Sequence, residues 1–480
     1  MISFQLLNRF GCGVASGSMW GVLLFGLVLS PGCKSPAFEG TLFGEQQSAG
    51  EKEKPEGNID TALPEPFRCE PEGMEVSKAG VRRLQTDQYE QSLSVWLGID
   101  EPIFDFELAN SGIVTALTAE KIGTAANRLA NESSNAGDRL LQCKNRQASE
   151  QRDCALVFLE SFGGNVFRRP VDSEEKAWLN GLYDVMLPEL GFEDTASAFI
   201  EVVLQSPQAL YILEKGQEAP GLEEGVRALD GFERASRLAL FLWNQALNEA
   251  LLEKAKAGLL DTDEGVRETA RQMLKEPMAA TVVKKFIVDL LGLNGGMILP
   301  ALEQIEKDSE RFPQFDEDLL KAMRTEIEAF AEKVLLSDGG SYRALWDNNQ
   351  AYVNRELAEL YGVGFDTSGE EFQWLDLPNN QRAGLLTRAA FLALYAHSSH
   401  QSPILRGAHI LSDVFCQPPG SPPPDVDDSP IAPKKFDAST VSFVRDSMTE
   451  RTQGPECEGC HIWINNIGFA FDHYDVLGVW

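Results

Sequence analysis

The sequence predicts a mainly α-helical protein. From Val81 onward, apolar residues recur every three or four positions, which is the periodicity of amphipathic helices. Residues that favour helix starts, such as Ser before Glu or Pro, precede several of these segments. Signals for β-strands are few. These three observations predict a multi-helical body, followed by a small C-terminal segment of different character.

The first 33 residues have the pattern of an export signal. Arg9 is the only charged residue before an apolar stretch at 10–29, and Cys33 follows shortly after it. This order resembles a bacterial lipoprotein signal, in which the cysteine is lipidated, although Leu29 lies four residues before Cys33 rather than three. Ordinary cleavage and a retained anchor helix are the alternatives. All three predict a chain outside the cytoplasm, periplasmic, secreted or anchored to a membrane such as the outer membrane.

Residues 34–75 are predicted to form a disordered acidic tether, because they contain few apolar residues to bury. Three helical domains are expected after it, at 76–220, 221–300 and 301–416. A proline-rich linker at 417–435 is then expected to be extended and semi-rigid. It separates the helical body from the terminal segment at 436–480.

Within the body, the first helix is expected around Leu84 to Leu97. A helix over 155–162 is expected to end at Gly163 and Gly164, and Ser173 is expected to cap the next one. Further helical segments are expected at 193–206, 231–244, 247–257, 263–274, 279–291, 316–336, 353–361, 382–396 and 404–415. Ser402, followed by proline, is expected to start the last of these.

Two other features of the body are predicted to be structural. One short strand is expected at 372–377. Arg168 and Arg169 are expected to make salt bridges at a helix joint rather than to bind an anion. No phosphate-binding glycine loop, serine-hydrolase elbow or zinc-protease motif occurs in the sequence.

The terminal segment contains Cys457, Cys460 and His461 in a C-x-x-C-H sequence, the attachment motif for a c-type haem. Two thiols at this spacing can bond the two vinyl groups of one haem, and the histidine then binds the iron as its proximal ligand. We therefore expect haem c in a cytochrome-c-like segment. A structural disulfide, half of a zinc site and a thioredoxin-like pair are the alternatives. Zinc would need two more ligands nearby, and a thioredoxin motif should follow a strand.

The second axial ligand of the iron is left open by the sequence. His473 is the strongest donor after the motif, and upstream lie His397, His400 and Met448. An open or water-bound position is a further alternative.

The remaining cysteines fit an oxidising compartment. Two of the eight belong to the export segment and two to the motif, which leaves an even number. Cys143 and Cys154 are close in sequence and are expected to pair first. Cys69 and Cys416 would then form the second disulfide. Four free thiols are the alternative.

The charge of the chain excludes some partners. Lys and Arg total 42 against 73 Asp and Glu, a formal net charge of −31. The sequence has no basic run, so nucleic acid and anionic polymers are not expected as partners. The acidity favours solubility, and it would attract a basic redox partner.

A series of short motifs follows in a fixed order. They are RRLQTDQY (82–89) with WLG (96–98), FRRPV (167–171) with QSPQALY (205–211), ASRL (235–238) with FLW (241–243), NRELA (354–358) with YG (361–362), RAGLLT (382–387), SP (402–403) with RG (406–407), the proline run, and C-x-x-C-H with GFAF (468–471) and YD (474–475). Together they resemble the large exported bacterial proteins built from consecutive domains of unknown function and associated with Planctomycete-type cytochrome c domains.

The resemblance covers about residues 81–480 and implies an exported, haem-associated protein. Proteins of this kind usually continue with a further C-terminal domain, so it also implies that the chain is truncated or a short variant at Trp480. Two function classes follow. The first is a membrane-anchored c-type haem protein that transfers electrons or takes part in an extracytoplasmic oxidation. The second is a non-redox binding or scaffold protein in which Cys457 and Cys460 form a disulfide.

Overall fold

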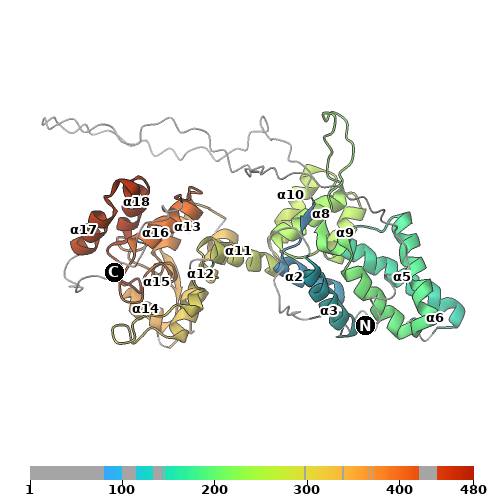
Figure 1. Ribbon diagram of the computed structural model, residues 1–480, viewed down its shortest axis with the longest axis horizontal. Helices are drawn as coiled ribbons and strands as arrows, with labels where there is room; N and C mark the ends of the chain where they lie inside the picture. Colours follow the sequence, from blue (N-terminus) through green and yellow to red (C-terminus); the bar gives the residue numbers. More distant parts are fainter. Residues whose placement is uncertain are drawn as a thin grey trace, which may run out of the picture. The chain divides into compact units, whose positions relative to one another are not determined.

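The computed structural model describes residues 81–99, 115–132, 143, 146–296, 299–337, 340–366, 368–369, 371–420 and 441–480. Within these residues the protein is mainly α-helical, with two small antiparallel sheets of two strands each (Figure 1). The predicted fold class is therefore confirmed. The expected export signal, the tether and most of the proline-rich linker lie outside the described residues. No described helix has the length and apolar character needed to cross a membrane.

The first group of elements surrounds one apolar core. It comprises β1 (Arg82–Arg83), α2 (Thr86–Leu97), α3 (Ala116–Glu132), α5 (Ala148–Phe167), α6 (Ser173–Leu204), α7 (Pro207–Leu210) and β2 (Tyr211–Ile212). β1 pairs with β2, with Arg82 opposite Ile212. The buried Tyr89 of α2 donates a hydrogen bond to the carbonyl of Leu204, 3.0 Å away, at the end of α6. The apolar stripe predicted around Leu84 to Leu97 is thus the face that α2 buries.

The second group forms a smaller core of short helices. It comprises α8 (Gly231–Leu242), α9 (Glu249–Lys256) and α10 (Asp263–Met273). Each begins with a side chain that accepts a hydrogen bond from the first turn, namely Asp230, Asn248 and Thr262. The next helix, α11 (Pro277–Leu290), contributes Ala279 to this core and Ile287 to the following one. Consequently α11 joins two cores.

The third group holds the largest core. It comprises η1 (Leu302–Gln304), α12 (Glu317–Glu332), η2 (Lys333–Ser337), α13 (Ala344–Asp347), β3 (Gln350–Val353), α14 (Arg355–Tyr361), β4 (Gln373–Asp376), η3 (Leu385–Thr387), α15 (Ala389–Leu394), α16 (Pro403–His409), η4 (Ile410–Val414), α17 (Val441–Thr452), α18 (Pro455–Gly468) and η5 (Phe469–Phe471). β3 and β4 are antiparallel, with Tyr352 opposite Trp374. Every residue of α15 is buried, so this short helix lies at the centre of the core.

Some predicted boundaries are confirmed and others are wrong. The strand expected at 372–377 is β4, and Ser402 caps α16 by accepting a hydrogen bond from the backbone of Leu405. By contrast, α5 continues through Gly163 and Gly164 to Phe167. Gly163 serves packing instead, since an added Cβ would lie 3.1 Å from Leu179. Asp172, not Ser173, caps α6, because its carboxylate accepts from two backbone amides of the first turn.

Of the segment expected to be helical at 382–396, only Ala389–Leu394 is α-helical, and Leu385–Thr387 forms a single 3-10 turn. Gly384 has a φ of 61°, and a Cβ there would lie 2.3 Å from the carbonyl oxygen of Trp346. The chain therefore passes too close to its neighbour for any other residue. Arg388, fully buried, then donates to the carbonyls of Gly384, Asn348 and Gln350. Those backbone contacts replace the helical hydrogen bonds that the periodicity predicts.

The terminal segment shares the core of the preceding helices. Phe471 and Tyr474 belong to the same buried cluster as the residues of α15. The two parts expected at 301–416 and 436–480 therefore bury apolar side chains together. The predicted domain limits stay predictions.

Candidate functional site

The C-x-x-C-H sequence lies at the start of α18. Gly454 is the N-cap and Pro455 occupies the first helical position, where its missing amide hydrogen costs nothing. The backbone amide of Cys457 donates to the carbonyl of Gly454, 2.8 Å away. Residues three and four positions apart lie on the same side of a helix. The helix therefore places Cys460 and His461 on the side that carries Cys457.

Both thiols are free, and apolar surface adjoins them. Cys457 is half-buried and Cys460 is exposed. Trp463, three residues after Cys460 and so on the same side of α18, is 59% exposed. An exposed aromatic side chain beside an accessible thiol offers a binding surface to a flat apolar group. The disulfide considered as an alternative for these cysteines is not formed in the structure.

His461 is held by one of its ring nitrogens. Its Nδ1 lies 3.1 Å from Oδ1 of Asn465, one turn further along α18. Asn465 is buried and donates from Nδ2 to the hydroxyl of Thr452, at the end of α17, over 2.8 Å. With Nδ1 engaged, Nε2 is the ring nitrogen that remains for a metal. The residues present therefore fit the attachment of a haem.

Two glycines fix α18 against α16, its neighbour in Figure 1. A Cβ at Gly407 would lie 2.0 Å from the carbonyl oxygen of Ile464, and one at Gly468 would lie 1.9 Å from that of Pro403. The two backbones are thus in direct contact, which only residues without a side chain permit. This contact determines where the motif lies on the core.

Arg406 forms hydrogen bonds with the backbone of the residues that follow α18. Its buried guanidinium donates to the carbonyls of Leu392 at 2.9 Å, Phe471 at 3.2 Å and Asp475 at 3.0 Å. Burial lowers the pKa of Arg406 to about 10. On the other side, Arg445 of α17 pairs with Asp472 at 2.8 Å. Sequence reasoning treated the Arg406-Gly407 pair only as part of a motif, because the carbonyls that it binds are up to 69 residues away.

The four candidate distal ligands lie in three places. Met448 is buried on α17, which packs on α18. His473 is exposed and stacks on Trp480, with ring centroids 4.8 Å apart. His397 and His400 lie in the turn after α15, with ring centroids 4.4 Å apart. Within the described ranges, no three His, Cys, Asp or Glu side chains are grouped so that they could hold a metal ion.

The turn that contains His397 and His400 is held by hydrogen bonds from Lys307, a residue that the sequence did not single out. Lys307 donates to the carbonyls of Ala393, Ala396 and His397 at 2.8–3.1 Å. Burial lowers the pKa of its amine to about 7. Burial also lowers the pKa of His397, with the charge of Lys307 as a second cause. It lowers that of His400 to about 4, where the neighbouring His397 adds to the effect. Nothing in the local sequence around Lys307 marks it, because its acceptors come from a distant helix end.

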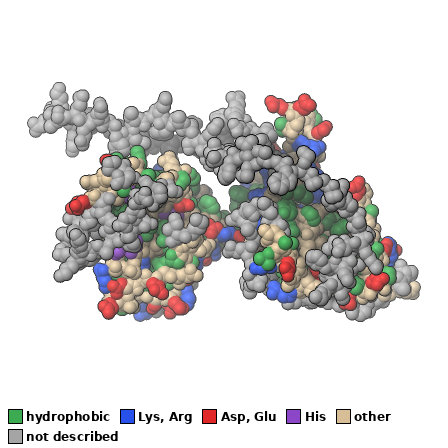
Figure 2. Space-filling model, viewed as in Figure 1, with side chains coloured by type: hydrophobic (Ala, Val, Ile, Leu, Met, Phe, Trp, Pro, Cys, Tyr) green, Lys and Arg blue, Asp and Glu red, His purple; other side chains and the backbone are tan. Residues whose placement is uncertain are grey.

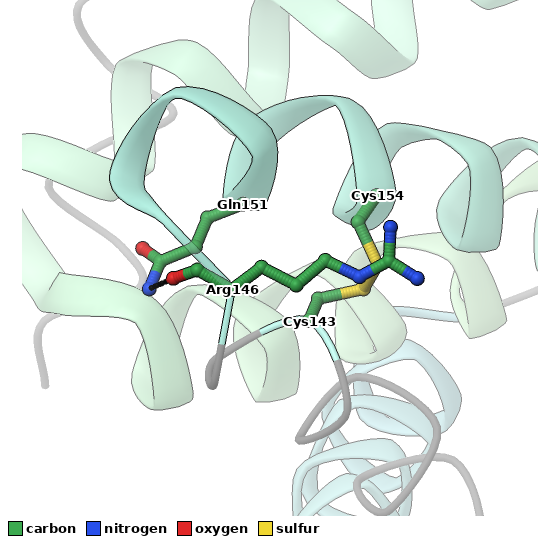
Figure 3. The surroundings of a disulfide bond; sticks show 4 residues. All are labelled: Cys143, Arg146, Gln151 and Cys154. Carbon is green, nitrogen blue, oxygen red and sulfur yellow. Dashed lines mark hydrogen bonds between the residues drawn. A yellow bond between two sulfur atoms is a disulfide. The ribbon is translucent and has the colours of Figure 1, made fainter.

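Cys143 and Cys154, the pair that sequence spacing favours, are joined by a disulfide at the start of α5 (Figure 3). Their Cα atoms are 5.6 Å apart, within the usual range for such a bond. Beside it, Gln151 donates to the carbonyl of Arg146 over 3.2 Å. Cys416 is an exposed free thiol and Cys69 lies outside the described residues, so the second disulfide stays a prediction.

Arg169 makes the salt bridge predicted for this pair, whereas Arg168 donates to backbone carbonyls instead. Arg169 forms a two-point ion pair with Glu175, at 2.7 and 2.8 Å. Arg168 donates to the carbonyls of Gln208 and Tyr211, which holds α7 and β2 against the end of α5. An anion site would need these donors to be free.

On the face shown in Figure 2, acidic and basic side chains are interspersed over the described surface, without an extended basic region. Acidic side chains gather on the loop before α8, where Glu218, Glu223 and Glu224 are exposed. This distribution agrees with the net charge of −31.

Three family models match parts of the chain. Residues 154–214 match PSD5, a protein of unknown function (DUF1595), residues 229–363 match PSD4, a protein of unknown function (DUF1592), and residues 382–480 match PSCyt3, a protein of unknown function (DUF1588). These are domains of unknown function associated with Planctomycete cytochromes c. No curated protein and no solved structure matches the chain. The third match includes α15, α16 and the whole C-x-x-C-H helix.

Proposed function

We propose that this chain is an extracytoplasmic c-type haem protein that transfers electrons. Haem c would be attached through Cys457 and Cys460, with His461 as the proximal ligand of the iron. The observation that carries the proposal is the C-x-x-C-H sequence at the start of α18, with both thiols free and on the side of the helix that carries the histidine. A haem bound there supplies one-electron redox chemistry.

The chain's own residues have three tasks at this site. The two cysteines hold the cofactor, so it is not lost outside the cell. Trp463, 59% exposed and three residues after Cys460 on the same side of α18, provides apolar surface that a macrocycle would remove from water. The glycine contact between α16 and α18 keeps the helix, and with it the ligand backbone, in one position.

The comparisons support this proposal without stating it. The model that matches residues 382–480 carries a cytochrome-type name, PSCyt3, and is described as of unknown function. Its match begins at Arg382 and so includes the buried arginines that hold the terminal segment. The haem-motif helix is therefore part of the matched region rather than an appendage to it.

We further propose that the chain is exported and tethered to a membrane by a lipid on Cys33. The support is the apolar stretch before this cysteine and the polar segment at 34–75. The net charge of −31 favours a basic redox partner, since opposite charges speed encounter. An unidentified extracytoplasmic oxidation would be the source or destination of the electrons.

The proposal is tested by expression with a cytochrome c maturation system. We expect a c-type reduced spectrum, with haem that stays on the protein through acid–acetone extraction and adds one haem to the intact mass. Cys457→Ser with Cys460→Ser should abolish it. Cys416→Ser is the matched control, because it removes an exposed free thiol outside the motif. Protein that leaves this system without haem, and with a Cys457–Cys460 disulfide by mass, would instead be the non-redox scaffold.

A further inference from the structure

A chain of hydrogen bonds leads from a backbone carbonyl to His461. The hydroxyl of Thr452 donates to the carbonyl oxygen of Met448 over 2.7 Å. Nδ2 of Asn465 donates to that hydroxyl over 2.8 Å. Oδ1 of Asn465 lies 3.1 Å from Nδ1 of His461. The chain connects the last turn of α17 to the second turn of α18.

The direction of this chain follows from the chemistry of its first member. A carbonyl oxygen can only accept, so the one hydroxyl hydrogen of Thr452 is donated to the carbonyl of Met448. Toward Asn465, the hydroxyl oxygen can then only accept. The carboxamide must therefore turn its nitrogen toward Thr452 and its oxygen toward His461. An amide oxygen also only accepts. Nδ1 of His461 consequently carries the hydrogen, and in a neutral imidazole Nε2 then carries the lone pair.

We propose that Asn465 and Thr452 are positioning residues that hold His461 in the Nδ1–H tautomer before any cofactor is attached. This is the form whose Nε2 can bind iron, so the functional meaning of the inference rests on the proposed haem site. A hydrogen bond from the far nitrogen of a ligating imidazole fixes its ring and makes the ligand nitrogen a stronger donor.

The position of Asn465 supports a role beyond packing. Asn is a poor residue for a helix interior, because its side chain competes for backbone hydrogen bonds. Asn465 lies within α18 and is only 6% exposed, where an apolar residue would pack without needing partners. Both of its polar ends are nonetheless used, one on Thr452 and one on His461. The neighbouring Ile464, equally buried, shows what packing alone would select.

The tautomer can be measured without haem. The full-length chain contains five histidines, so ¹⁵N-histidine labelling gives few ring signals, and His461→Gln assigns those of His461. In the neutral imidazole, we expect Nδ1 to be the protonated nitrogen. Asn465→Asp keeps an acceptor and should keep this tautomer, whereas Asn465→Leu should give a mixture. Protonation on Nε2 in the unsubstituted protein would overturn the inference.

Thr452→Val tests the direction of the chain. It removes the acceptor of Asn465 and allows the carboxamide to turn over, so the tautomer ratio of His461 should shift toward a mixture. Thr449→Val is the matched control, because Thr449 makes the same bond to a backbone carbonyl on α17, to Arg445 at 2.8 Å. Equal effects of the two substitutions, with unchanged circular dichroism, would show a general response of α17 and contradict the assignment.

In the haem-loaded protein, the reduction potential gives a second readout. A stronger ligand favours the ferric state, so Asn465→Asp should lower the potential and Asn465→Leu should raise it. Potentials that stay the same in both variants would overturn the role in tuning. If no haem attaches at all, the proposed function fails, while the nitrogen spectrum still decides whether Asn465 orients His461.

Discussion

At the scale of single residues, three buried arginines connect distant segments of the C-terminal core through hydrogen bonds. Arg382, Arg388 and Arg406 are each at most 1% exposed, and each donates mainly to backbone carbonyls. Arg388 also pairs with the fully buried Glu326, 3.1 Å away. A buried guanidinium must find acceptors for its hydrogens, so each arginine gathers carbonyls from several segments. Sequence motifs contained Arg382 and Arg406 but not Arg388, and the partners of all three lie too far along the chain for spacing to reveal.

Gly468 of α18 gives the sharpest prediction at this scale. Gly468→Ala should destabilise the protein by about 1–3 kcal/mol, because the new Cβ would lie 1.9 Å from the carbonyl oxygen of Pro403 and must push α18 off α16. Gly459→Ala, on the same helix, has nothing within 4 Å and should be neutral or slightly stabilising. Chemical denaturation of both variants measures the difference. Equal midpoints would mean that the two helices can separate at no cost.

At the scale of elements, the turn after α15 shows how hydrogen bonds stabilise the end of a short helix. The isolated bridge from Ala396 to Gln401 closes the turn, and the amine of Lys307 satisfies carbonyls at the end of α15. Burial is the main cause of the lowered pKa of both histidines, and the Lys307 amine, with a pKa of about 7, adds a positive charge beside them in mildly acidic solution. The pair is therefore kept neutral by its surroundings.

This arrangement predicts loss of stability in acid. The pKa of His400 is about 4 in the folded protein, below its ordinary value of 6.5. The unfolded chain thus binds more protons between these values, so stability falls as pH drops from 6.5 toward 4. His400→Gln should remove about 1 kcal/mol of this loss, a small figure because the ring is half-exposed. His473→Gln, at an exposed ring on Trp480, is the control. Parallel pH profiles of both variants and the parent chain would refute the prediction.

At the scale of the whole molecule, local rules predicted the helices but not how they are grouped. Periodicity found α8 to α12 nearly at their observed bounds, because amphipathic helices carry their pattern in consecutive residues. The same rules placed a boundary in the proline-rich stretch at 417–435 and treated the last segment as separate. The shared packing of α15 and Phe471 was not predicted, because it joins residues far apart in sequence. Likewise, the motif predicted Cys457, Cys460 and His461. The hydrogen bond between Asn465 and Thr452 could not be predicted, because it depends on how α17 packs on α18.

The shared core predicts that the terminal segment stabilises the preceding helices whether or not haem is bound. Phe471→Ala should cost about 3–5 kcal/mol, because this ring is 9% exposed and packs near Phe391, with ring centroids 6.1 Å apart. Phe415→Ala, at a ring 56% exposed, should cost little. The double substitution Cys457→Ser with Cys460→Ser should prevent haem attachment. The cooperative thermal unfolding of this variant should match that of the unsubstituted chain without haem.

Hydrogen exchange locates the effect of Phe471→Ala. If the two parts form one core, the substitution should speed exchange in α15 and α18 together, since both lose the same packing partner. Faster exchange confined to α17 and α18, with α15 still protected, would restore the terminal segment as an independent domain. Faster exchange confined to α17 and α18 in the Cys457→Ser, Cys460→Ser variant would show that the cofactor, and not the aromatic packing, holds the terminal segment in place.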